Sequence, residues 1–132
     1  MENTLIDTSD FVFKKFNALK LSNAEYTKKI FGNQDIIYSA GLFDYLKTEV
    51  LTKIITSLYA NLNEGGIIIA PFKDANNYKT FDYHWNCDWT YFFQRSVAEV
   101  ESILSDAIPD EAKLKILPTG VAAINFFIIT KK

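Results

Sequence analysis

The sequence predicts an α/β fold: a mostly parallel sheet with flanking helices and an antiparallel hairpin at the C-terminal end. Two observations predict it. Apolar runs typical of buried strands alternate with segments whose apolar residues recur at helical spacing, and a short Pro-Thr-Gly link separates the last two runs. The length of 132 residues suits one domain. We therefore expect residues 1–132 to fold as a single unit, with residues 1–10 as a loose N-terminal segment.

Two strands and a short helix are predicted in the first 40 residues. Residues 11–16 (FVFKKF) are strand-like. The stretch LSNAEYTKKIFGNQ predicts a helix that Ser22 or Asn23 can cap and that a Gly-Asn pair can end. Asp35 to Ser39 then form an apolar strand that contains two β-branched isoleucines.

A longer helix and a central strand follow. The helix is expected from Thr48, as its N-cap, to Asn63, with one wide apolar stripe. Its end is expected at Gly65 or Gly66, either of which can take the left-handed conformation. The next run, IIIAPF, is apolar at nearly every position, which is typical of a central strand in a covered parallel sheet.

The C-terminal third predicts a helix and a hairpin. Ser96 and Glu99 have the spacing of a capping box at the start of the stretch SVAEVESILSDA. Lys113 to Leu117 and Val121 to Thr130 are expected as strands. The three residues between them suit an antiparallel connection.

Composition excludes several classes of protein. The net charge is −2 and there is no basic stripe, so nucleic acid is not an expected partner. One cysteine rules out an internal disulfide, and a single histidine argues against a metal site. The first ten residues lack the pattern of a signal peptide, and the longest nearly apolar run is shorter than a membrane span of about 20 residues. We expect a cytoplasmic protein.

Three stretches together resemble the C-terminal half of a class I S-adenosylmethionine-dependent methyltransferase. DIIYSAGLFDYL is similar to the fourth strand and its following loop, LYANLNEGGIIIAPF to the helix, Gly-Gly turn and fifth strand, and TGVAAINFFIITKK to the final antiparallel strand. The SAGLFDYL motif resembles most a bacterial group of these proteins, some of which form fatty-acid methyl esters. The resemblance implies a partial Rossmann-like methyltransferase sheet.

The sequence departs from that family in its N-terminal portion. The family's first strand ends in a glycine-rich loop at the cofactor, and its second strand ends in an acid that holds the ribose. None of the five glycines of this chain is in a GxGxG arrangement. The resemblance therefore implies that S-adenosylmethionine binds only if another polypeptide supplies the missing half.

The same departure predicts an association. In the family's strand order the fourth strand lies beside the first, so its absence would leave Asp35 to Ser39 as an apolar edge with unpaired backbone groups. Three coverings are possible: the strand at residues 11–16, a second copy of the chain, or a separate protein. We expect re-pairing or dimerisation, because a bare apolar edge would aggregate.

The loop after the 35–39 strand carries the first candidate site residues. Open α/β sheets bind ligands at the carboxyl ends of their strands. By resemblance, Ser39, Ala40 and Gly41 would border the cofactor's sulfonium, and Phe43 to Tyr45, with Asp44 between the two rings, would border the methyl acceptor. The alternative is structural: Gly41 makes the turn, Phe43 packs, and Asp44 caps the next helix.

A second group lies in the aromatic segment from Phe72 to Phe93, which holds nine of the twenty aromatic residues. This segment resembles a lid over an acceptor pocket. His84 is the candidate general base, because histidine titrates near neutral pH. Arg95 is a candidate for binding an acceptor carboxylate. The remaining candidates for acceptor binding are the ring residues Trp85, Trp89 and Tyr91.

Each of these candidates has a structural alternative. The rings can form a satellite core, His84 can be a surface or hydrogen-bonded residue, and Cys87 has no partner that would make it a nucleophile. Two functions therefore remain open. One is methyl transfer to a small or lipid-like acceptor after complementation, and the other is a non-catalytic interaction or regulatory domain.

Overall fold

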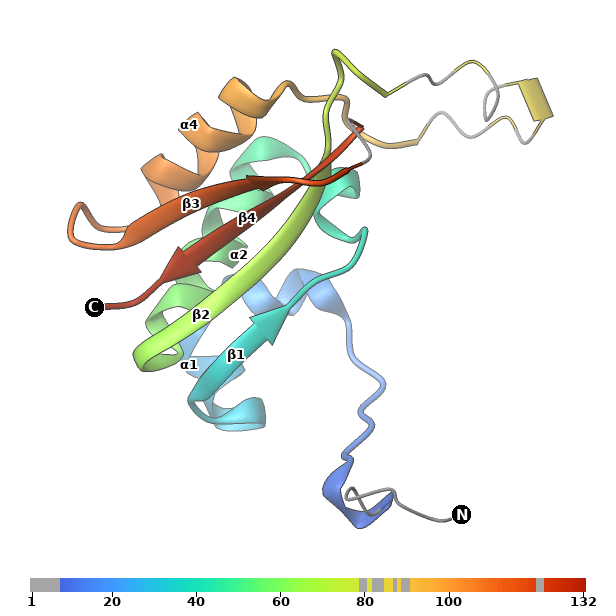
Figure 1. Cartoon of the computed structure of the whole chain (residues 1–132). Helices are drawn as coiled ribbons and strands as arrows, with labels where there is room; N and C mark the ends of the chain where they lie inside the picture. The colour runs from blue at the N-terminus through green and yellow to red at the C-terminus, as the bar shows by residue number, and fades with distance from the viewer. Residues whose placement is uncertain (1–7, 79–80, 82–84, 87, 89–90, 121–122) are drawn as a thin grey trace, which may run out of the picture.

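The computed structural model describes residues 8–78, 81, 85–86, 88, 91–120 and 123–132, which form a four-stranded sheet backed by helices (Figure 1). The helices are α1 (Ala24–Phe31), α2 (Thr48–Ala60) and α4 (Val97–Ala107), with 3-10 turns η1 (Thr8–Asp10), η2 (Ala18–Ser22) and η3 (Phe43–Tyr45). The strands are β1 (Gln34–Tyr38), β2 (Leu62–Lys73), β3 (Lys113–Pro118) and β4 (Ile124–Thr130).

The strand order β1-β2-β4-β3 confirms the predicted fold class. Strand β1 pairs in parallel with β2 through the crossover helix α2. Strand β4 lies between β2 and β3 and is antiparallel to both, so β1, β2 and β3 run in one direction. The carboxyl ends of β1 and β2 therefore meet at one edge of the sheet, where the predicted site residues lie.

The core lies between the sheet and α2. Alternate residues of the two central strands are buried on this side, namely Ile68, Ala70, Phe72, Phe127 and Ile129. They pack against the apolar stripe of α2, in which Leu51, Ile54 and Ile55 have no exposed surface. Period-two alternation in the strands and helical spacing in α2 thus place two apolar surfaces face to face.

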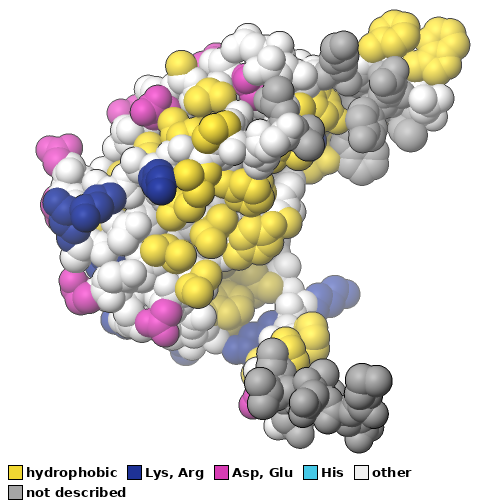
Figure 2. All heavy atoms as spheres, in the orientation of Figure 1, with side chains coloured by type: hydrophobic (Ala, Val, Ile, Leu, Met, Phe, Trp, Pro, Cys, Tyr) yellow, Lys and Arg dark blue, Asp and Glu magenta, His cyan; other side chains and the backbone are white. Residues whose placement is uncertain are grey.

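The opposite face of the sheet carries no helix among the described residues. Its side chains are apolar but only partly buried in the centre, and Ile36 and Tyr38 at the β1 edge are 63% and 59% exposed. Figure 2 shows hydrophobic side chains gathered over the strands on this face. The IIIAPF run is explained by this arrangement, because Ile67 and Ile69 supply the outer face and Ile68 the core.

Three local predictions need correction. Residues 11–16 are not a strand: they are extended, make no ladder, and expose Phe13 at 92%. Helix α2 ends at Ala60 with Asn61 as its C-cap, so Gly65 and Gly66 are part of β2 instead of ending the helix. Strand β4 begins at Ile124, so the hairpin link is longer than three residues.

The predicted caps can be checked directly. The Asn23 side chain accepts a hydrogen bond from the Tyr26 N–H at 2.9 Å, and Ser96 and Glu99 form the reciprocal capping box. The backbone N–H and hydroxyl of Ser96 hold the pKa of Glu99 below its ordinary value. Thr48, in contrast, is not the cap of α2, which begins after Lys47 without a side-chain cap. No described helix is long and apolar enough to cross a membrane.

Gly66 is required where β1 and β2 meet. A Cβ at this position would lie 2.9 Å from the Asn63 carbonyl oxygen and 3.1 Å and 3.2 Å from those of Gln34 and Asp35. Because backbone atoms cannot move aside cheaply, Gly66→Ala should lower the free energy of unfolding by about 1–2 kcal/mol. Gly120→Ala is the matched control, since nothing lies within 4 Å of its Cβ. Equal urea midpoints for both variants would contradict this packing.

Candidate functional site

The turn after β1 joins the sheet to the site. Gly41 has a φ of +74°, a conformation that favours glycine, and the chain then enters η3. Ser39 remains tied to the sheet because its N–H donates to the Ile69 carbonyl at 3.1 Å. Ala40 is exposed, so the turn presents small side chains at the carboxyl end of β1. The turn therefore lies at the end of β1, and the contact of its residues with a cofactor stays a prediction.

Asp44 and Lys73 form a partly buried ion pair next to this turn. Asp44 is 4% exposed, and its Oδ2 lies 3.0 Å from the Lys73 Nζ. Its Oδ1 accepts the Lys73 backbone N–H at 3.4 Å, and its carbonyl accepts the Phe93 N–H at 2.7 Å. Asp44 therefore links η3 to the end of β2 and to the returning chain at residue 93, and it does not cap α2.

Three aromatic rings surround the Lys73 ammonium. Its Nζ lies 4.9 Å from the centroid of Phe92, 5.8 Å from Tyr78 and 6.0 Å from Tyr45. Phe92 also makes edge contacts with both tyrosine rings. A carboxylate with several aromatic faces is a favourable environment for a cation. In this structure Lys73 fills that position.

Arg95 is buried beside the ion pair. Its Nη2 donates to the Leu46 carbonyl at 2.6 Å, its guanidinium lies 5.2 Å from the Phe93 centroid, and its Nη1 is buried with no hydrogen-bond partner. Burial lowers the pKa of Arg95 from its ordinary value, while the charge of Asp44 opposes that shift. The guanidinium thus ties the end of η3 to the start of α4.

Two hollows border the turn. One, of about 90 Å³, lies between Gly41, Asp44, Lys73 and Ile124. It has room for about three waters at roughly 30 Å³ each, well below the about 300 Å³ of a small-molecule site. The other, of about 320 Å³, runs along β1 from Phe31 to Ser39, and none of the described residues that line it is charged. We call this second hollow the β1 groove.

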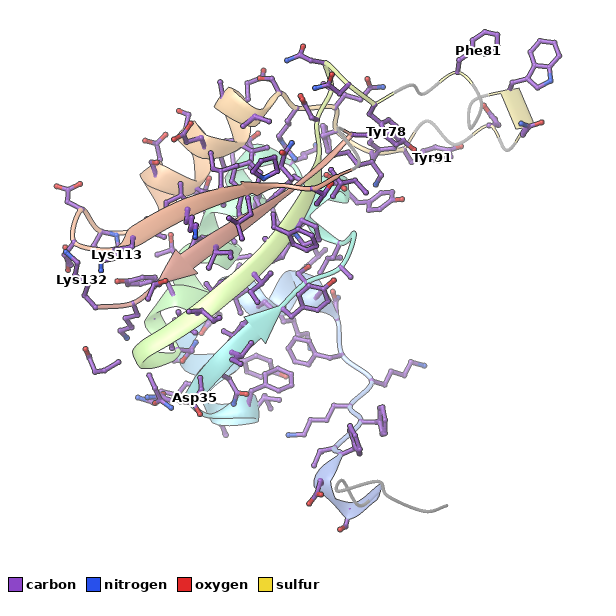
Figure 3. The ribbon with its side chains drawn as sticks, in the orientation of Figure 1. Asp35, Tyr78, Phe81, Tyr91, Lys113 and Lys132 are labelled. Carbon is purple, nitrogen blue, oxygen red and sulfur yellow. The ribbon has the colours of Figure 1, made fainter. Side chains whose placement is uncertain are left out.

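The other predicted residues that the structure describes lie in the core and on the aromatic segment. Trp85 and Tyr91 are 78% and 77% exposed. Figure 3 places Tyr91 near Tyr78, where the aromatic segment leaves the sheet, and Phe81 farther out. Phe43 is buried against Phe72, with ring centroids 6.0 Å apart. His84 and Trp89, together with Cys87, lie outside the described residues.

Sequence reasoning missed Lys73, Tyr78 and Phe92. The signal for Lys73 was available, because it follows the IIIAPF run directly and so stands at the carboxyl end of a central strand. No comparable signal exists for Tyr78 and Phe92. They meet only because the chain leaves and returns beside η3, with the Ala75 N–H donating to the Arg95 carbonyl at 2.9 Å.

Solved structures with this fold are known. A possible exported protein from Bordetella parapertussis matches 88% of this chain at 18% identity, with a TM-score of 0.61. An S-adenosylmethionine-dependent methyltransferase from Thermotoga maritima, a possible histamine N-methyltransferase, matches 74% at 17% identity and a TM-score of 0.55. The protein PigF, solved with SAH, matches 74% at 14% identity and a TM-score of 0.56.

This chain spans 42%, 56% and 30% of the lengths of those three chains. No protein-family model matches the sequence, and no curated protein matches it. At these identities the likeness establishes the fold alone. The chain has the α/β fold of S-adenosylmethionine-dependent methyltransferases.

Proposed function

We propose that this chain is the acceptor-side portion of an S-adenosylmethionine-dependent methyltransferase and that it does not transfer methyl groups alone. One observation carries the proposal. On a methyltransferase fold, the small residues of the Ser39–Gly41 turn stand at the carboxyl end of β1, directly beside an aromatic and acidic cluster. Ligands of open α/β sheets bind at this position.

The residues present fit only part of a cofactor site. Ser39, Ala40 and Gly41 leave room for close approach of a sulfonium. However, the 90 Å³ hollow at Gly41 is too small for a nucleoside, and the described residues that line the β1 groove include no acid that could hold ribose hydroxyls. A glycine-rich loop and a ribose-binding acid must therefore come from additional polypeptide. When bound, the cofactor would supply the methyl group.

The acceptor side rests on exposed rings. Tyr45, Trp85 and Tyr91 are 37%, 78% and 77% exposed. Such a surface suits a small aromatic or lipid-like acceptor, which the enzyme would hold in line with the methyl carbon, so that catalysis is mainly positioning. Asp44 and Arg95 would support this surface from below, since both are buried. His84 and Trp89 keep their proposed roles as base and ring contact.

A non-catalytic interaction domain is the second candidate, and Lys73 favours it. A methyl donor brings a cation to this end of the sheet. Here a cation of the chain itself, the Lys73 ammonium, already lies among Phe92, Tyr78 and Tyr45 and is neutralised by Asp44. Because the Lys73 ammonium already occupies this position, the three rings and Asp44 have less affinity for the sulfonium of a cofactor.

Titration with S-adenosylhomocysteine tests the proposal. By calorimetry, we expect the isolated chain to bind more weakly than about 1 mM, because most of the contacts are missing. In amide NMR spectra, millimolar ligand should shift the Ala40 and Gly41 signals and leave that of Gly120, in the β3–β4 connection, unchanged. Micromolar binding would contradict the need for additional polypeptide. No shift at Ala40 and Gly41 would favour the interaction domain.

A further inference from the structure

The open edge of β1 has unpaired backbone groups. Among the residues that the structure describes, no strand lies on the side of β1 away from β2. The Ser39 N–H donates to β2, and backbone direction alternates along a strand, so residues 36 and 38 direct their N–H and C=O groups outward. With Ile36 and Tyr38 more than half exposed, this edge is a template for one more strand.

The β1 groove lies beside that edge on the helix side of the sheet. Ile37 faces it, and Phe31, Leu42, Phe43 and Leu58 form its walls. A strand added to β1 would direct alternate side chains into the groove. At about 320 Å³, the groove has room for large apolar side chains.

The N-terminal segment of the chain has the sequence of such a strand. Phe11 and Phe13 alternate with Val12 and Lys14, and no proline interrupts them. All three apolar residues are exposed, at 54% for Phe11, 77% for Val12 and 92% for Phe13. The segment is therefore a strand-forming sequence without a partner strand among the described residues.

The structure favours a second copy as the partner of this segment. Lys14 Nζ donates to the Ile30 carbonyl at 2.7 Å, and the Phe16 ring packs on Phe31 with centroids 5.1 Å apart. These contacts hold the base of the segment at the end of α1. Residues 8–13 extend away from the sheet (Figure 1), so they reach outward instead of back along their own β1.

We propose that, when no additional polypeptide covers β1, two copies of this chain exchange residues 11–16, each adding them as an antiparallel strand to β1 of the other copy. The register is selected by two conditions, namely that opposite charges lie opposite each other and that the phenylalanines lie on the groove side of β1. With Lys15 opposite Asp35, the second residue of β1 (Figure 3), Phe13 lies opposite Ile37 and Phe11 opposite Ser39. Both phenylalanines then enter the β1 groove, and Val12 joins Tyr38 on the open face. A parallel strand with Phe13 opposite Ile37 would separate Lys15 from Asp35.

The buried area is adequate for a symmetric dimer. A phenylalanine buries about 150–250 Å², so the exposed parts of Phe11 and Phe13 from both copies supply roughly half of the about 1,200 Å² of a stable interface. Val12, Ile36 and Tyr38 add to this, and each exchanged strand also pairs its backbone. Exchange of an identical element between protomers is a known route to closed dimers.

Analytical ultracentrifugation of the full chain tests the exchange. The unaltered protein should be a dimer at micromolar concentration, and Phe13→Asp should raise the dimer dissociation constant at least about tenfold. Because Phe13 is 92% exposed within one chain, this change should leave the fold intact, which circular dichroism would verify. Phe81→Asp is the matched control, at 73% exposure on the aromatic segment, and should remain dimeric. An unaltered protein that is monomeric at 100 µM, or a Phe13→Asp dimer of unchanged affinity, would overturn the proposal.

A disulfide test separates exchange from closure within one chain. Phe13→Cys with Ile37→Cys, in a Cys87→Ser background, places two thiols opposite each other at a pair without backbone hydrogen bonds, where Cα atoms approach to about 4.5 Å. Exchange predicts a covalent dimer on a non-reducing gel after mild oxidation. An oxidised monomer would show that the segment pairs with its own β1 and would overturn the proposal. Either single cysteine variant should give no such dimer.

Discussion

Replacing Phe127 with alanine is expected to lower the free energy of unfolding by about 3–5 kcal/mol. Phe127 is 1% exposed at the centre of β4, and its ring meets the edge of Phe72 with centroids 5.5 Å apart. Truncation removes the apolar area that the ring buries and leaves a cavity that the sheet and α2 cannot close. Urea unfolding followed by circular dichroism would measure the loss.

Phe126→Ala is the matched control for that experiment. It removes the same ring from the adjacent residue, whose side chain lies on the outer face of the sheet and is only partly buried. We expect a loss of about 1 kcal/mol or less, because a partly solvated ring contributes less burial. Equal losses at both positions would show that the outer face is covered in solution, and would contradict the one-sided core.

The elements that the sequence predicts well are those whose structure depends on residues close together in the chain. The apolar stripe of α2, the alternation in β2 and β4, and the Ser96–Glu99 capping box all need only neighbours within a few residues. The fold class follows from them, since a parallel β1–β2 pair with a crossover helix places α2 on the sheet. The antiparallel β3–β4 hairpin is also found as predicted.

The failures have a common physical cause. Residues 11–16 have the composition of a strand, but a strand forms only with a partner, and the sequence does not show whether one is present. Gly65 has the positive φ expected of a helix-ending glycine, yet it serves β2, where its N–H donates to the Lys131 carbonyl at 3.0 Å. The local sequence predicts the conformation of Gly65, but it does not show whether this residue ends a helix or belongs to a strand.

Only the turn of the candidate site can be predicted from the sequence, because its other contacts also depend on partners that are distant in the chain. The turn at Gly41 can be found because it follows a strand directly. The interior of the site depends on residues far apart in the sequence, such as Asp44 with Lys73, 29 positions apart, and Leu46 with Arg95, 49 positions apart. Those pairings follow from the β1–β2 crossover and the return of the aromatic segment, which no local pattern encodes.

Replacing Asp44 with asparagine is expected to cost about 2–3 kcal/mol of unfolding free energy. Removing one member of a buried ion pair typically costs about 3–5 kcal/mol, because the other charge is left uncompensated. Here the Lys73 side chain is 25% exposed, so its ammonium can turn partly toward water, which reduces the cost. The Arg95 guanidinium cannot turn toward water, because Arg95 is 6% exposed. Two acids, Asp44 and Glu99, favour its charged form, and the contribution of Asp44 is the larger.

The expected loss can be assigned by comparing variants. Asp106→Asn, on the exposed surface of α4, removes the same charge and should change the free energy of unfolding by less than about 0.5 kcal/mol. Lys73→Met keeps the packing against Phe92 and removes the ammonium. In a double-mutant cycle, Asp44→Asn with Lys73→Met should recover part of the loss, since the uncompensated ammonium is gone while Arg95 remains.

The coupling free energy between Asp44 and Lys73 shows whether Asp44 stabilises Lys73 alone or Arg95 as well. If the cluster is a support for the site, Asp44 acts on both cations, and the double variant stays less stable than Lys73→Met alone, because the buried Arg95 has lost the acid whose charge favours its charged form most. Full recovery in the double variant would show that Asp44 serves Lys73 only. In that case Arg95 would be held by its hydrogen bond to the Leu46 carbonyl and by its contact with Phe93. Asp44 would then form an ion pair with Lys73 and have no effect on Arg95.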